Sequence, residues 1–162
     1  MPSEQSGPGL VTLHIGEFQT RVAQAGIAGK GEQETTVGIG FMSPGAALSH
    51  TPPTALELEH AIAAVEDVVM TLASSLPRAA GLATSDALAH RIAALGSDRG
   101  AQGELLPVDA VESLFNDMAA VALGRPAAGS PFLDSALCGY LLILREFMHH
   151  LGFACVLVRP AS

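Results

Sequence analysis

Residues 130–152 read SPFLDSALCGYLLILREFMHHLG, and this stretch decides the fold. Ser130-Pro131 is a helix start signal and Gly152 is a stop signal, so the pattern predicts a long helix between them. Apolar residues recur along it at alternating spacings of four and three, which places them on one helix face. They are Leu133, Leu137, Tyr140, Leu144, Phe147 and Leu151. Such a face must be buried against another element.

A second segment, residues 54–76, repeats this spacing and predicts the partner helix. Its apolar positions are Leu58, Ile62, Val65, Val69, Leu72 and Leu76. Thr54 and Glu57 form a capping box at its start, because each side chain can bond a free backbone N–H of the other. Pro77 prevents continuation of the helix. We therefore expect two long helices that bury apolar faces.

The N-terminal part of the chain alternates apolar and polar residues, as a half-buried strand does. Residues 10–15 (LVTLHI) and 18–22 (FQTRV) flank Gly16-Glu17, which predicts a hairpin with a two-residue turn. In that register Ile15 pairs with Phe18, Leu13 with Thr20 and Val11 with Val22, and His14 lies on the solvent-facing side.

Two further strands and two shorter helices complete the expected fold. Residues 35–42 predict a third strand, and residues 153–158 predict a central strand because they are apolar on both faces. Helices are expected from Thr84 or Ser85 to Gly96 and over residues 107–123. The fold class is therefore α+β, with a sheet of about four strands and about four helices. We expect a disordered tail over residues 1–9 and a single domain over residues 10–162.

Composition favours self-association and disfavours two classes of partner. Hydrophobic residues make up 49% of the chain and charged residues only 15%, which predicts a homo-oligomer, most simply a dimer. The net charge is −8 and the eight basic residues are scattered singly, so neither nucleic acid nor an anionic membrane is an expected partner. The longest apolar run near the C-terminus, residues 136–144, is too short to span a bilayer, and no signal peptide is evident. We expect a cytoplasmic protein with Cys138 and Cys155 buried and unpaired.

Two Glu-x-x-His motifs, Glu57 with His60 and Glu146 with His149, invite comparison with di-iron bundles. In such bundles the ligands point inward. At 100° per residue, Glu146 lies about 140° and His149 about 160° from the centre of the apolar stripe, so both point away from the interior. A bundle metal site is therefore not predicted. Glu146, His149 and His150 remain a candidate for a metal at the surface.

Candidate ligand-binding residues lie in two polar loops. Ser49, His50 and Thr51 belong to the loop over residues 43–53, which ends at a helix start, where anions bind readily. Arg99 belongs to the loop over residues 97–106. If a small-molecule site exists, we expect it where these two loops approach the sheet.

Two functional interpretations follow from these observations. The main one is a non-enzymatic cytoplasmic interaction or binding module that self-associates through apolar helix faces, because no catalytic motif accompanies the two stripes. The alternative is a small enzyme or small-molecule sensor with a site in loops 43–53 and 97–106. The sequence leaves open whether the protein is an enzyme, predicts no particular cofactor or catalytic residue, and allows a protein partner or a small ligand.

Overall fold

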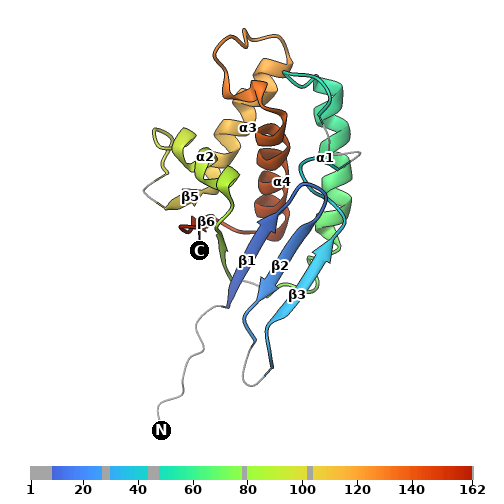
Figure 1. The fold of residues 1–162 in the computed structure, drawn as a ribbon, viewed down its shortest axis with the longest axis vertical. Coiled ribbons are helices and arrows are strands. Elements are labelled where there is room, and N and C mark those ends of the chain that lie inside the picture. The colour runs from blue at the N-terminus through green and yellow to red at the C-terminus, as the bar shows by residue number, and fades with distance from the viewer. Residues whose placement is uncertain (1–8, 27–29, 44–47, 78–79, 102–103, 162) are drawn as a thin grey trace.

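The computed structural model describes residues 9–26, 30–43, 48–77, 80–101 and 104–161, which form an α+β fold (Figure 1). The strands are β1 (Leu10–Ile15), β2 (Thr20–Gln24), β3 (Gln33–Val37), β4 (Gly81–Thr84), β5 (Leu105–Pro107) and β6 (Cys155–Val158). The helices are α1 (Ala55–Met70), α2 (Ala87–Leu95), α3 (Val108–Ala122) and α4 (Ser135–Leu151), with a short 3₁₀ helix η1 (Pro131–Leu133) before α4. The predicted fold class is confirmed.

The sheet has six strands in the order β3-β2-β1-β4-β6-β5. β1, β4 and β6 are parallel, whereas β2, β3 and β5 each run antiparallel to a neighbour. The expected count of about four strands is too low, because β4 and β5 are only four and three residues long and have no alternating pattern. The predicted central position of the C-terminal strand is confirmed, since β6 lies between β4 and β5.

The predicted hairpin register is wrong by two residues. Ile15 pairs with Thr20 and Leu13 with Val22, so four residues, 16–19, form the turn. Gly16 N–H donates to the Gln19 carbonyl at 2.9 Å and closes it. A shift of two residues keeps the same side chains on each face. Val11, Leu13 and Ile15 accordingly face the core as predicted, and His14 stays on the other side.

The third strand is shorter than predicted because the chain folds back onto the β1–β2 turn. β3 ends at Val37, and Phe41 N–H donates to the Gly16 carbonyl at 3.0 Å. Gly40 makes this contact possible, since a Cβ there would lie 2.3 Å from the Gly16 oxygen. The Ser43 hydroxyl accepts from Gly40 N–H at 2.8 Å and fixes the bend. The fold-back places Phe41 beside the carboxyl end of β1.

Helix α4 is the centre of the helical layer, where it contacts α1, α2, α3 and β1. Tyr140, Leu144 and Phe147 of the predicted stripe are fully buried. Leu133 is exposed, contrary to the prediction, because Asp134 caps α4 and leaves Leu133 in the preceding 3₁₀ turn.

The first stripe is also buried against the core, although α1 ends at Met70, earlier than predicted. Glu66 near the end of α1 lies 4.0 Å from His150 at the end of α4, so the two helices run in the same direction (Figure 1). Glu57 and Glu146 therefore lie at opposite ends of the helical layer.

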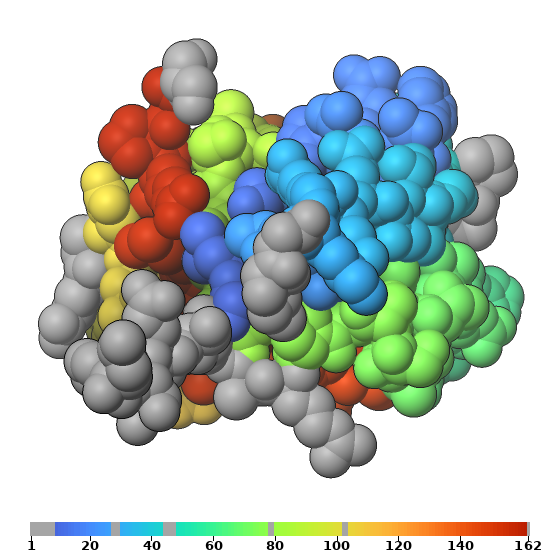
Figure 2. Space-filling view, turned by 90° about the horizontal axis from the view of Figure 1, so that it is seen from below, coloured from blue at the N-terminus to red at the C-terminus, as the bar shows by residue number. Residues whose placement is uncertain are grey.

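Strands β1–β3 lie in front of the long helices in Figure 1, and the view from below shows β3 at the molecular surface (Figure 2). Four of the five β3 residues are exposed. The expected tail, residues 1–9, lies outside the described residues except for Gly9. Within the described part of the chain, none of the helices combines the length and apolarity that a bilayer crossing requires.

Candidate functional site

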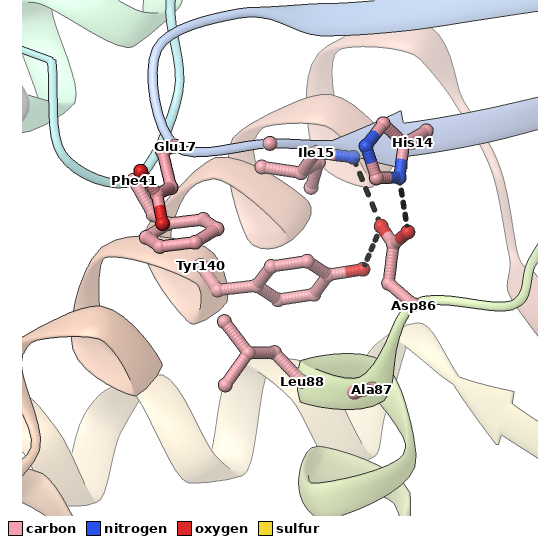
Figure 3. Close-up of a pocket in the computed structure, with 9 residues that line it drawn as sticks. His14, Ile15, Glu17, Phe41, Asp86, Ala87, Leu88 and Tyr140 are labelled. Carbon is pink, nitrogen blue, oxygen red and sulfur yellow. Dashed lines mark hydrogen bonds and ion pairs between the residues drawn. The ribbon is translucent and has the colours of Figure 1, made fainter.

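Asp86 gathers three donors at the carboxyl ends of two parallel strands (Figure 3). Its Oδ2 accepts from Ile15 N–H at 2.9 Å and from the Tyr140 hydroxyl at 2.8 Å. Its Oδ1 lies 2.5 Å from His14 Nδ1. β1 supplies His14 and Ile15, the start of α2 supplies Asp86, and α4 supplies Tyr140. The Asp86 carboxylate thus links the start of α2 to β1 and α4, which are distant from it in the sequence.

The position of Asp86 in the chain would suit a helix cap, but its side chain does not act as one. It precedes α2 as the N-cap residue and makes no side-chain hydrogen bond to the helix. An Asp at this place ordinarily accepts from the first turn of its own helix. Here the Asp86 N–H donates to Thr84 Oγ1 at 3.2 Å, and the carboxylate faces β1 and α4. Its donors thus come from the site and not from the helix.

Tyr140 is the only tyrosine in the chain and is fully buried. Burial of the phenol, reinforced by the negative charge of Asp86 and the hydrogen bond to it, raises the Tyr140 pKa well above its ordinary value. The phenol therefore keeps its proton near neutral pH and donates a hydrogen bond to Asp86.

His14 is far more exposed than Asp86, since 48% of its side chain is accessible to solvent, against 8% for Asp86. Because the carboxylate accepts at Nδ1, the proton of a neutral imidazole lies on that nitrogen and Nε2 has a free lone pair. A Cβ on Gly16 would lie 3.5 Å from Nε2, so this atom is beside the β1–β2 turn. A carboxylate in this position orients the ring and stabilises the imidazolium that forms when Nε2 takes a proton.

A pocket of about 330 Å³ opens beside these residues. It is lined by His14, Ile15, Gly16, Glu17, Phe41, Asp86, Ala87, Leu88 and Tyr140. Figure 3 shows Glu17 and Phe41 at one end and His14 with Asp86 at the other. In sheets with parallel strands, ligands commonly bind outside the carboxyl ends of the strands, which is the location of this pocket.

Ser49 and His50 form hydrogen bonds with the carboxylate of Glu57, at the start of α1. Glu57 Oε1 accepts from Ser49 N–H at 2.9 Å and Ser49 Oγ at 2.5 Å, and it lies 2.9 Å from His50 Nδ1. Oε2 accepts from Thr54 N–H at 2.9 Å, which completes the predicted capping box. Partial burial opposes ionisation, but these hydrogen bonds outweigh it and hold the Glu57 pKa well below its ordinary value. The loop is thereby fixed onto its helix.

Residues 44–47 and 102–103 of the two candidate loops lie outside the described residues, and the structure does not bring the described parts of these loops together. Arg99 pairs with Asp117 of α3 at 2.6 Å. In Figure 1, α2 and β5, which flank the Arg99 loop, lie on the other side of α4 from α1. Thr51 is exposed in the loop that precedes α1. None of Ser49, His50, Thr51 and Arg99 lines the pocket beside Asp86, and their role as ligand contacts stays a prediction.

The candidate surface metal ligands make contacts with protein groups. Glu146 is fully buried, so the prediction that it points outward is wrong, because neighbouring elements surround α4 on several sides. Its carboxylate accepts from Arg145 and lies 2.9 Å from His150 Nε2. His149 lies 3.6 Å from Glu112 on α3. Among the residues with a described placement, no three or more His, Cys, Asp or Glu side chains are arranged to hold a metal ion.

Neither a family model nor a curated protein sequence matches this chain. Solved structures do match its fold. The Ppx/GppA phosphatase of Aquifex aeolicus matches with a TM-score of 0.72 and 13% identity over 99% of this chain and 56% of that one. An exopolyphosphatase from Cytophaga hutchinsonii matches with a TM-score of 0.67 and 12% identity over 97% of this chain and 55% of that one.

The fold resembles that of Ppx/GppA phosphatases. At 12–13% identity the likeness establishes the fold, and this chain spans little more than half the length of each of these proteins. The likeness corrects the main functional interpretation of the sequence. The non-enzymatic interaction module is contradicted by this finding, because the solved structures named above, which share the fold over nearly the whole chain, are a phosphatase and an exopolyphosphatase. The alternative, a small enzyme or small-molecule sensor, agrees better with the fold.

Proposed function

We propose that the protein is a small-molecule hydrolase whose site is the pocket beside Asp86. The observation that supports it is a nearly buried carboxylate that orients an accessible histidine at the carboxyl ends of two parallel strands. His14 acts as the general base in this proposal, Asp86 positions it, and Tyr140 donates a hydrogen bond that fixes Asp86.

The proposed reaction uses one water molecule and no covalent intermediate. The water oxygen forms a bond to an electrophilic atom of the substrate while His14 Nε2 takes one of its protons. The bond to the leaving group breaks, and the leaving group departs with the electron pair and receives the proton from His14. Asp86 stabilises the imidazolium between these two proton transfers. General base catalysis of this kind contributes about 10²- to 10⁴-fold in rate.

The likeness in fold supports hydrolysis, but the residues of the pocket do not fit the class of substrate that the names of the similar structures suggest. The names of those proteins point to phosphoryl substrates. Phosphoryl groups need cationic partners, usually Arg, Lys or a bound divalent ion. Of the residues that the structure describes, no Arg or Lys lines the pocket, whereas the carboxylates of Glu17 and Asp86 do. We therefore propose hydrolysis on the basis of the fold, and we infer the class of substrate from the residues that line the pocket.

Substitution of His14 by Gln tests the proposed base. Wild type, His14→Gln and the control His50→Gln are assayed with p-nitrophenyl acetate, p-nitrophenyl phosphate and p-nitrophenyl phosphorylcholine. We expect His14→Gln to reduce the turnover of whichever ester the wild type hydrolyses by about 10²-fold or more. Circular dichroism should be unchanged, because His14 is half exposed. Wild-type turnover in His14→Gln, or no turnover of any ester by the wild type, would contradict the proposal.

We also propose that the protein self-associates and acts in the cytoplasm. Exposed Leu56 and Met70 on α1 and Leu123 after α3, with the low charge content, support self-association. Both cysteines are free, as in a reducing compartment, and burial raises the pKa of the Cys138 thiol to about 12. Native mass spectrometry should show a dimer, and a monomer across the micromolar range would be evidence against self-association.

A further inference from the structure

We infer that the pocket beside Asp86 takes a ligand with a positively charged head and an apolar body, and that Glu17 determines this specificity. The inference rests on the proposed function of the same pocket and names the class of substrate that it accepts.

The charges of the lining favour a cation. Among the described residues that line the pocket, the titratable side chains are Glu17, Asp86, His14 and Tyr140. The phenol of Tyr140 is neutral, so the two carboxylates outnumber the single histidine. Asp86 already accepts from three donors. Glu17 is exposed and forms no ion pair with any residue that the structure describes. Its charge is therefore available to a ligand.

The remaining lining favours an apolar body next to that charge. Ile15, Leu88 and Phe41 contribute carbon surface, and the Phe41 ring lies 6.4 Å from the Tyr140 ring at 53°. Phe41 is half-buried, so part of its ring remains open to an occupant. Figure 3 draws Glu17 and Phe41 together at one end of the pocket. An ammonium group placed there would contact both the carboxylate and an aromatic ring, and ring faces attract cations.

Two nearby positive features do not reverse this preference. Arg21 lies opposite His14 on β2 and lines an adjoining hollow, which His14 also borders. Glu32 and Glu34 line that hollow too, and their charges oppose that of Arg21. The N-terminus of α2 borders the pocket and carries partial positive charge, but its N-cap residue, Asp86, places a negative carboxylate next to it, on the side of β1 and α4. A phosphate dianion would therefore enter a region of negative potential, and the net charge of −8 reinforces that potential.

Two small aliphatic probes with the same body and opposite heads test the inference. Isothermal titration calorimetry compares n-butyltrimethylammonium with mono-n-butyl phosphate. Emission from Tyr140, the only tyrosine in a chain without tryptophan, reports whether binding occurs at this pocket. We expect the ammonium probe to bind about tenfold tighter than the phosphate and to change the emission. Glu17→Gln should weaken it about fivefold, and Glu59→Gln, an exposed control on α1, should leave it unchanged.

The other outcomes separate the ligand class from the site. Tighter binding of butyl phosphate, with a change in Tyr140 emission, would overturn the ligand class and leave the pocket as the proposed site. Ammonium binding that is insensitive to Glu17→Gln would overturn the role of Glu17. If neither probe binds or changes the emission, the inference fails. The His14→Gln assay then decides separately whether the hydrolase proposal stands.

Discussion

Leu144→Asp is expected to unfold the protein. Leu144 has no exposed surface and lies in the middle of α4, between the sheet and its neighbouring helices. Loss of such a buried leucine by itself costs about 2–5 kcal/mol, and the new carboxylate must also be buried without a partner or take up a proton. The sum approaches the 5–15 kcal/mol by which domains are ordinarily stable.

Circular dichroism during thermal unfolding measures this effect, with Leu133→Asp as the control. Leu133 lies in the 3₁₀ turn just before α4 with 44% of its surface exposed, and a carboxylate there suits the positive end of the helix. We expect the control to remain within about 0.5 kcal/mol of the wild type. A cooperative wild-type transition in Leu144→Asp would show that the stripe on α4 does not form the core.

Asp86→Asn is expected to abolish most of the activity while the fold is retained. An amide has nearly the shape of the carboxylate, but it carries no charge and can donate to His14, which favours the wrong imidazole tautomer. In a comparable carboxylate–imidazole pair the same substitution lowers kcat by about 10⁴-fold. Because Asp86 acts through His14 in the proposed mechanism, we expect a loss of about 10²-fold or more, not exceeding that of His14→Gln, for any ester that the wild type hydrolyses.

The control for this substitution is Asp134→Asn, because Asp134 also precedes a helix but caps it, through Leu137 N–H at 3.2 Å. It should affect stability slightly and leave the turnover number unchanged. Equal turnover by Asp86→Asn and the wild type would remove Asp86 from the proposed mechanism.

Helix positions were predictable because periodicity reports burial directly. The alternating spacing in α1 and α4 follows from 3.6 residues per turn, and Val65 and Leu144 are buried as that pattern requires. The strand β6 was predictable for a related reason, since apolar residues on both of its faces favour a central position. The burial of Glu146 was not predictable from the sequence. The spacing of apolar residues indicates one buried face for α4, whereas other elements surround this helix.

The site was not predictable because the sheet pairing creates it. Ile15 and Asp86 are 71 residues apart, and their contact depends on the parallel pairing of β1 with β4. β4 is four residues long, and the sequence pattern indicates only its last residue, Thr84, as a possible helix start. His14 was correctly placed on the solvent-facing side, and Tyr140 was correctly placed in the core. Recognition of β4 as a strand would have indicated Asp86, which lies at its carboxyl end, as a candidate.

Spectrophotometric titration of Tyr140 tests the geometry of the site without knowledge of the substrate. The folded protein holds the Tyr140 pKa above the unfolded value of about 10. The neutral phenol therefore stabilises the fold fully below about pH 10, and this contribution is lost as the pH rises from there toward the folded pKa. Asp86→Asn should lower the pKa of Tyr140 in the folded protein, since it removes a charge but leaves the burial in place.

We expect no tyrosinate absorbance in the wild type near pH 10, and its appearance only at higher pH together with loss of the circular dichroism signal. Reversible ionisation of Tyr140 near pH 10 in a fully folded wild-type protein would contradict a buried phenol held by Asp86.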